Sequence, residues 1–210
     1  MKKIVFVILL CNSIHLANAQ NEALTFDENH FIYLGLQGGI GNYYTPSYSI
    51  DLNYVYKCKY SAKLLYSEID SKPKDYPNDH RPFKQGLDPT ENLRTLELLV
   101  GRVFNLNKAG TIRANLSAGV GYAIYRKAVY ERWDFSLNNY PWHYEDRHPI
   151  TFILNPKIEF PLTKGWGLVI SPMVKINNQR VFFGIEFGTI VGLLRARKYY
   201  YYDKAIELSK

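Results

Sequence analysis

Histidines lie beside acidic residues at one point of the chain, where His143, Glu145, Asp146 and His148 fall within a single short stretch. Imidazole nitrogens and carboxylate oxygens, together with cysteine thiolates, are the usual protein ligands of zinc. The spacing of these four residues matches no recognised zinc motif, and a polar stretch between strands is typical of a solvated loop. The sequence therefore predicts no metal site and no bound cofactor.

The histidines also bear on whether the chain carries a hydrolase site. Such a site needs a histidine that activates a serine, or an aspartate and a histidine that activate water. His30, His80, His143 and His148 all precede a predicted strand or lie in a predicted loop, so none has a serine one or two pleats away on a strand. The glycines between positions 35 and 41 form no phosphate-binding loop, because no helix follows them. We predict that the protein is not an enzyme.

Apolar residues recur at every second position over long stretches, which is the period of a β-strand. Ile32, Leu34 and Leu36, for example, alternate with Tyr33 and Gly35. A helical period does not fit these windows. The predicted strands are residues 31–43, 47–56, 59–69, 92–105, 111–126, 149–161, 166–177 and 180–193.

Two features complicate this division into strands. The residues on one face keep the same parity from Tyr48 to Tyr66, so either a turn with an odd number of residues lies near 57–59, or the segment is one very long strand. Bacterial membrane barrels have an even number of strands, which favours the turn and a total of eight. Pro156 and Pro172 fall inside two strands, where we expect a bulge or a locally unpaired position, because proline has no N–H to donate.

The apolar faces indicate that the strands cross a membrane. Their length approaches the roughly 9–11 residues that a tilted membrane strand needs, and the opposite faces mix glycine, serine, asparagine and charge. The aromatic residues toward the strand ends, as in the girdles of such barrels, are Tyr44, Tyr48, Tyr56, Tyr66, Tyr122 and Trp166. The predicted fold is all-β: a transmembrane antiparallel up-and-down β-barrel of about eight strands. The alternative is a soluble periplasmic barrel of the lipocalin kind, whose glycine-rich, charged face would have to point outward.

The first residues have the order of a secretory signal peptide. Lys2 and Lys3 precede the apolar run Ile4–Leu10, and residues 17–19 form a small-x-small cleavage site. We predict cleavage near Ala19, a short segment over 20–30, the barrel over 31–193 and a periplasmic tail over 194–210, with the protein in the outer membrane of a diderm bacterium. Cleavage leaves one cysteine and excludes an intrachain disulfide. The basic residues do not cluster on one face, so nucleic acid is not a predicted partner.

Loop lengths predict the orientation of the barrel. The connections near Cys58, at 106–110 and at 162–165 are short, whereas 70–91 and 127–148 are long and polar. Short turns face the periplasm in outer-membrane barrels and long loops face outward, which places both termini in the periplasm. Aromatic residues that would either contact an unknown external ligand or protein partner, or pack on one another, are Tyr76, Phe83, Trp133, Phe135, Tyr140, Trp142 and Tyr144.

In architecture and patterning, residues 31–193 resemble the small outer-membrane β-barrels typified by OmpX, the OmpA membrane domain and PorT-like proteins. The stretch Glu186-x-Gly188-x-x-Val191-x-Leu193 is similar to the final-strand signal that the barrel assembly machinery recognises in this family. The resemblance implies outer-membrane lipid and that machinery as partners. The tail after Leu193 departs from the family pattern, in which the chain often ends on an aromatic residue of the last strand.

Charged residues occur on the face that would line the lumen. An eight-stranded barrel is just wide enough for its own side chains to fill, and buried charges are costly unless they are paired. We therefore predict a network of salt bridges, with a small ion path as the alternative, and a structural or surface-interaction role for the protein. The predicted network residues are Asp51, Lys63, Glu97, Arg113, Lys157, Glu159, Lys175 and Glu186.

Overall fold

The structure is a computed structural model that describes residues 30–42, 45–73, 89–107, 111–130 and 142–194. Every element of this part of the chain is a strand. The strands are β1 (His30–Gly41), β2 (Pro46–Tyr56), β3 (Tyr60–Ser71), β4 (Glu91–Asn105), β5 (Arg113–Tyr130), β6 (Trp142–Arg147), β7 (Ile150–Pro161), β8 (Trp166–Ile176) and β9 (Val181–Leu193).

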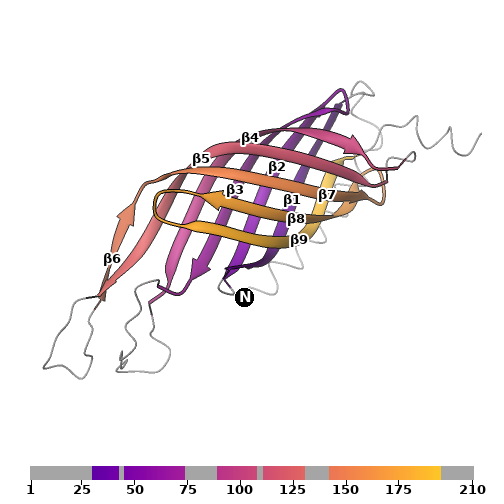
Figure 1. The fold of residues 1–210 in the computed structure, drawn as a ribbon. Coiled ribbons are helices and arrows are strands. Elements are labelled where there is room, and N and C mark those ends of the chain that lie inside the picture. Colours follow the sequence, from indigo (N-terminus) through magenta and orange to yellow (C-terminus); the bar gives the residue numbers. More distant parts are fainter. Residues whose placement is uncertain (1–29, 43–44, 74–88, 108–110, 131–141, 195–210) are drawn as a thin grey trace, which may run out of the picture.

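The strands form one closed antiparallel barrel (Figure 1). Eight of them follow one another around the wall in the order β1, β2, β3, β4, β5, β7, β8 and β9, and β9 pairs with β1 to close it. The predicted all-β barrel of eight strands is confirmed. Within the described ranges, no helix is long and apolar enough to cross a membrane.

Strand β6 is a continuation of β7 and does not add a ninth member to the wall. The pairs Tyr122–Ile150 and Tyr125–Arg147 belong to one unbroken register along β5. Pro149 separates β6 from β7 because it lacks an N–H, yet its carbonyl still accepts the Ala123 N–H at 3.0 Å. The β5–β6 hairpin therefore projects past the wall, at the lower left of Figure 1.

The hairpin corrects two predictions. Residues 127–148 are not one long loop, because β5 runs to Tyr130 and β6 begins at Trp142. His143 consequently lies on a strand, and His30 opens β1. In β6 both faces are exposed from His143 to Asp146, so the alternation of buried and exposed residues that marks a strand is absent there.

The turn between β2 and β3 has three residues, so the predicted odd turn is confirmed. Tyr56 pairs with Tyr60 across it, and the Lys59 N–H donates to the Tyr56 carbonyl at 3.0 Å. Lys57 and Cys58 have φ values of 49° and 54°, the left-handed conformation that tight hairpin turns require. Asparagine and glycine usually occupy such positions, and because neither occurs here, only the parity and the even strand number indicated the turn in the sequence.

The two strand prolines face each other. Strands β7 and β8 pair on both sides of Pro156 and Pro172 in a single register, and the ladder is interrupted between. Each proline keeps a partner on its other side, and the Asn155 side-chain amide donates to the Pro172 carbonyl at 3.3 Å. The predicted unpaired position is therefore confirmed, without a bulge.

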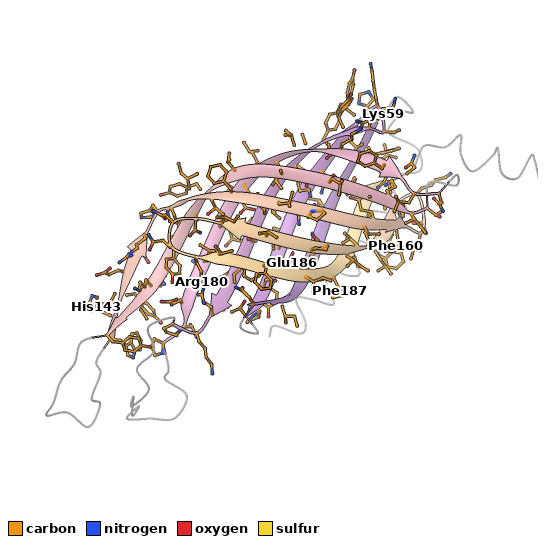
Figure 2. All side chains as sticks on the ribbon, in the orientation of Figure 1. Lys59, His143, Phe160, Arg180, Glu186 and Phe187 are labelled. Atoms are coloured by element: carbon orange, nitrogen blue, oxygen red, sulfur yellow. The ribbon has the colours of Figure 1, made fainter. Side chains whose placement is uncertain are left out.

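The barrel has an apolar exterior and a largely polar interior. Leu98 and Val100 on the outer face are 68% and 73% exposed, whereas Glu97 and Leu99, which alternate with them along the strand, are buried. Figure 2 shows the same alternation in β9, where Glu186 lies inside and Phe187 outside. Exposed aromatics gather near one end at Tyr48, Tyr66 and Tyr122, and near the other at Tyr54, Tyr56, Tyr60 and Trp166. The arrangement is that of a barrel whose outer surface lies in lipid, and it is the reverse of a lipocalin.

Candidate functional site

All eight residues predicted for the lumen network have buried side chains inside the barrel. Six of them form three ion pairs, of which two cross the interior and the third joins neighbouring strands. Arg113 lies 2.8 Å from Glu159, Lys175 lies 2.9 Å from Glu97, and Lys157 pairs with Asp51. These pairs join β5 to β7, β8 to β4, and β7 to β2.

Asp51 and Lys63 lie at the centre of one half of the network. The Asp51 carboxylate accepts hydrogen bonds from Lys157, Gln37 and Asn53. Within the described residues Lys63 pairs with no carboxylate, and it donates to the Ser117 hydroxyl at 2.9 Å and the Asn155 amide oxygen at 2.7 Å. Neutral acceptors from β5 and β7 thus replace a counter-ion at this lysine.

Lys175 organises the other half. Its ammonium group pairs with Glu97 and also donates to the hydroxyls of Ser67 and Thr95, which lie on β3 and β4. Glu186 on β9 accepts a hydrogen bond from the Ser49 hydroxyl at 2.6 Å. One side chain on β8 therefore holds two strands of the opposite wall.

Glycines on neighbouring strands make room for two of the lumen acids. Asp51 and Glu97 pair directly with Gly35 and Gly121 respectively. A Cβ at Gly121 would lie 2.3 Å from Cγ of Glu97, and one at Gly35 would lie 2.8 Å from both Asp51 carboxylate oxygens. These two glycines thus leave the space that the Asp51 and Glu97 side chains occupy.

At the end with the short turns, the interior closes on Arg113. Its guanidinium donates to the Leu194 carbonyl at 2.9 Å and lies 5.4 Å and 5.7 Å from the ring centroids of Phe31 and Tyr33. Leu194, where the predicted tail begins, is fully buried in an apolar cluster with both rings. Apolar packing and an ion pair therefore fill this mouth.

The opposite mouth is crossed by Arg180, from the turn between β8 and β9. Arg180 donates to Ser71 and lies 3.3 Å from the Glu91 carboxylate, which also accepts the Tyr125 hydroxyl at 2.6 Å. Figure 2 shows Arg180 at this end. Sequence reasoning missed Arg180 and Glu91 because both lie at the edges of predicted loops.

With these two residues the described lumen holds equal numbers of acidic and basic side chains. The buried acids are Asp51, Glu91, Glu97, Glu159 and Glu186. The bases are Lys63, Arg113, Lys157, Lys175 and the partly exposed Arg180. Five acidic side chains therefore face five basic ones.

The outward face of the β5–β6 hairpin carries aromatic and charged groups in contact. The Arg126 guanidinium lies 3.1 Å from the Asp146 carboxylate and 5.7 Å from the Tyr144 ring centroid. Trp142 meets Tyr144 edge to face, with centroids 5.0 Å apart. These groups lie on the same side of the sheet as the lipid-facing residues of the wall.

The four residues first considered as metal ligands are divided between the two faces of this hairpin. His143 lies 3.8 Å from Glu145 on one face, and Asp146 and His148 lie on the other. The His148 ring and the Tyr122 hydroxyl share a hydrogen bond of 2.8 Å. No group of three potential ligands occurs within the described ranges. His80, Tyr76, Phe83, Trp133, Phe135 and Tyr140 lie outside the described residues.

The sequence matches no family model and no curated protein. Similar solved structures include the N-terminal β-barrel domain of Pseudomonas aeruginosa OprF, with 12% identity, 79% of this chain and 98% of that chain covered and a TM-score of 0.48. Ail of Yersinia pestis, solved with the heparin analogue sucrose octasulfate, has 10% identity, coverages of 78% and 96% and a TM-score of 0.47. Neisserial surface protein A has 10% identity, the same coverages and a TM-score of 0.46. The likeness of this chain to these β-barrels is one of fold alone.

Proposed function

We propose that the protein is a non-enzymatic outer-membrane barrel with a surface-interaction role, exported by a signal peptide that is cleaved near Ala19. Its apolar exterior and aromatic girdles support contact with outer-membrane lipid, and the stretch from Glu186 to Leu193 supports recognition by the barrel assembly machinery. The short turns face the periplasm in this proposal, and the β5–β6 hairpin faces outward.

The filled lumen favours a structural network over an ion path. Ion pairs span the interior, the Leu194 cluster fills one mouth and Arg180 crosses the other. An eight-stranded barrel leaves no room beside such side chains for a water column. Conduction is the alternative function. Stable current steps from the full chain in planar bilayers would demonstrate it.

The hairpin is the observation that carries the interaction role. It extends the β-sheet beyond the wall and presents Trp142, Tyr144 and Arg126 on one face. Tryptophan, tyrosine and arginine are the residue types that contribute most of the binding energy at protein surfaces. Rigid backbone pairing holds them in place, so binding costs less conformational entropy than it would on a free loop.

Replacing Trp142 and Tyr144 with alanine is expected to weaken surface binding at least about tenfold, because the partner loses its contacts with two aromatic side chains. The measurement is adhesion of vesicles carrying the full chain to immobilised oligosaccharides and extracellular proteins. The matched control replaces Tyr60 and Trp166, exposed aromatics at the other end of the barrel. Equal loss in both variants, or no adhesion by the unaltered chain, would contradict the role of the hairpin.

A further inference from the structure

Exposed charges are distributed unevenly between the two ends of the barrel. At the end with the β2–β3 and β7–β8 turns, the exposed charged residues of the described part are all basic: Lys57, Lys59, Arg102 and Lys164. The acids with exposed or half-buried side chains are all at the other end: Glu68, Asp70, Glu145 and Asp146. Figure 2 shows Lys59 and His143 at these opposite ends.

Three of the basic residues are neighbours over β2, β3 and β4. Lys57 and Lys59 lie in the three-residue turn, and the Lys59 carbonyl accepts the Val103 N–H at 2.7 Å. Arg102 pairs across the ladder with Tyr60, the residue after Lys59. None of the three forms an ion pair with a carboxylate in the part of the chain that the structure describes.

The cluster borders the lipid-facing surface. Arg102 lies between Val100 and Phe104 on the outer face of β4, at the same level of the wall as the exposed Tyr60. The Arg102 guanidinium is 5.2 Å from the Phe104 ring centroid, and the Lys57 ammonium is 5.1 Å from that of Tyr56. Aromatic rings at a membrane interface lie at headgroup level, and long basic side chains extend from the apolar band toward the same level.

We propose that Lys57, Lys59 and Arg102 bind the phosphate of an anionic glycerophospholipid in the leaflet at this end of the barrel. The inference rests on the proposed membrane location and names the lipid class that the rim selects. The Arg102 guanidinium offers paired donors to phosphate oxygens, and the two ammonium groups add positive charge close to them. Within the described ranges no carboxylate pairs with these three residues, whereas at the other end Glu68 and Asp146 pair with Arg94 and Arg126.

Spin-labelled phosphatidylglycerol and phosphatidylcholine, compared in phosphatidylcholine vesicles that contain the full chain, test this site directly. The unaltered chain is expected to hold phosphatidylglycerol in its motionally restricted lipid shell several-fold more strongly than phosphatidylcholine. The triple variant Lys57→Gln, Lys59→Gln, Arg102→Gln is expected to bring this preference close to one, because it removes the three positive charges that attract the anionic headgroup.

The matched control is Lys72→Gln, Arg94→Gln, Arg126→Gln, which removes three exposed basic residues from the other end and leaves the same net charge. The control is expected to keep the preference. Equal preference in all three proteins, or equal loss in both variants, would overturn the site while leaving the barrel in the membrane. Failure of the unaltered chain to insert would instead contradict the membrane proposal, and a gel-mobility shift on heating separates these outcomes.

Discussion

Replacing Lys175 with methionine is expected to lower the free energy of unfolding by about 3–5 kcal/mol. The lysine is fully buried and is the ion-pair partner of Glu97, so its removal leaves a carboxylate without a counter-charge inside the barrel. It also removes the donor that holds Ser67 and Thr95 to the opposite wall. The measurement is denaturant unfolding in lipid vesicles, followed by tryptophan fluorescence.

A double variant separates charge from packing in this experiment. Lys175→Met combined with Glu97→Gln removes both charges of the pair and is expected to recover much of the lost free energy, because no unpaired carboxylate remains. A cost below about 1 kcal/mol for the single variant, or no recovery in the double variant, would show that the pair is not a buried ion pair of the lumen.

Replacing Leu98 with arginine is expected to cost about 2–4 kcal/mol in vesicles, because the side chain would enter hydrocarbon near mid-membrane. Leu98 pairs with Leu64 and Val120 in the middle of the wall and is 68% exposed. In a water-soluble barrel an exposed residue of this kind tolerates arginine with almost no change in stability. The two environments therefore predict different outcomes for one substitution.

The control for this variant is Tyr144→Arg on the same outward side of the sheet, in the hairpin beyond the wall. It is expected to cost about 1 kcal/mol at most, because the side chain lies in water and only the ring contacts of Tyr144 with Trp142 and Arg126 are lost. Denaturant unfolding in vesicles measures both variants. Equal, small costs would mean that Leu98 does not face lipid.

The strands of the wall were predictable because one face of each packs in the lumen and the other faces lipid. That difference imposes a period of two on the sequence, and the parity of Tyr48 through Tyr66 even revealed the odd turn. The same reasoning failed at β6, where four consecutive residues on alternating faces are all exposed: His143, Tyr144, Glu145 and Asp146. A strand with two solvated faces leaves no periodic signal.

The lumen residues were predictable as a set, but their partners were not. Alternation predicts which side chains point inward. Their pairing depends on which side chains lie at the same level along the barrel axis, and these come from strands distant in the sequence. Lys157 pairs with Asp51 and Lys175 reaches Ser67, contacts over 106 and 108 residues. Lys63 bonds to amide and hydroxyl oxygens, which no count of charges would reveal.

The most direct test of a closed transmembrane barrel is the mobility of the full chain, refolded into lipid vesicles, on a semi-native gel before and after boiling. For a closed transmembrane barrel we expect a faster unboiled band that appears only when lipid or detergent is present, since the barrel is closed by β1 and β9 and its outer face is apolar. A single unshifted band, from a protein that stays folded and soluble in buffer alone, would contradict it.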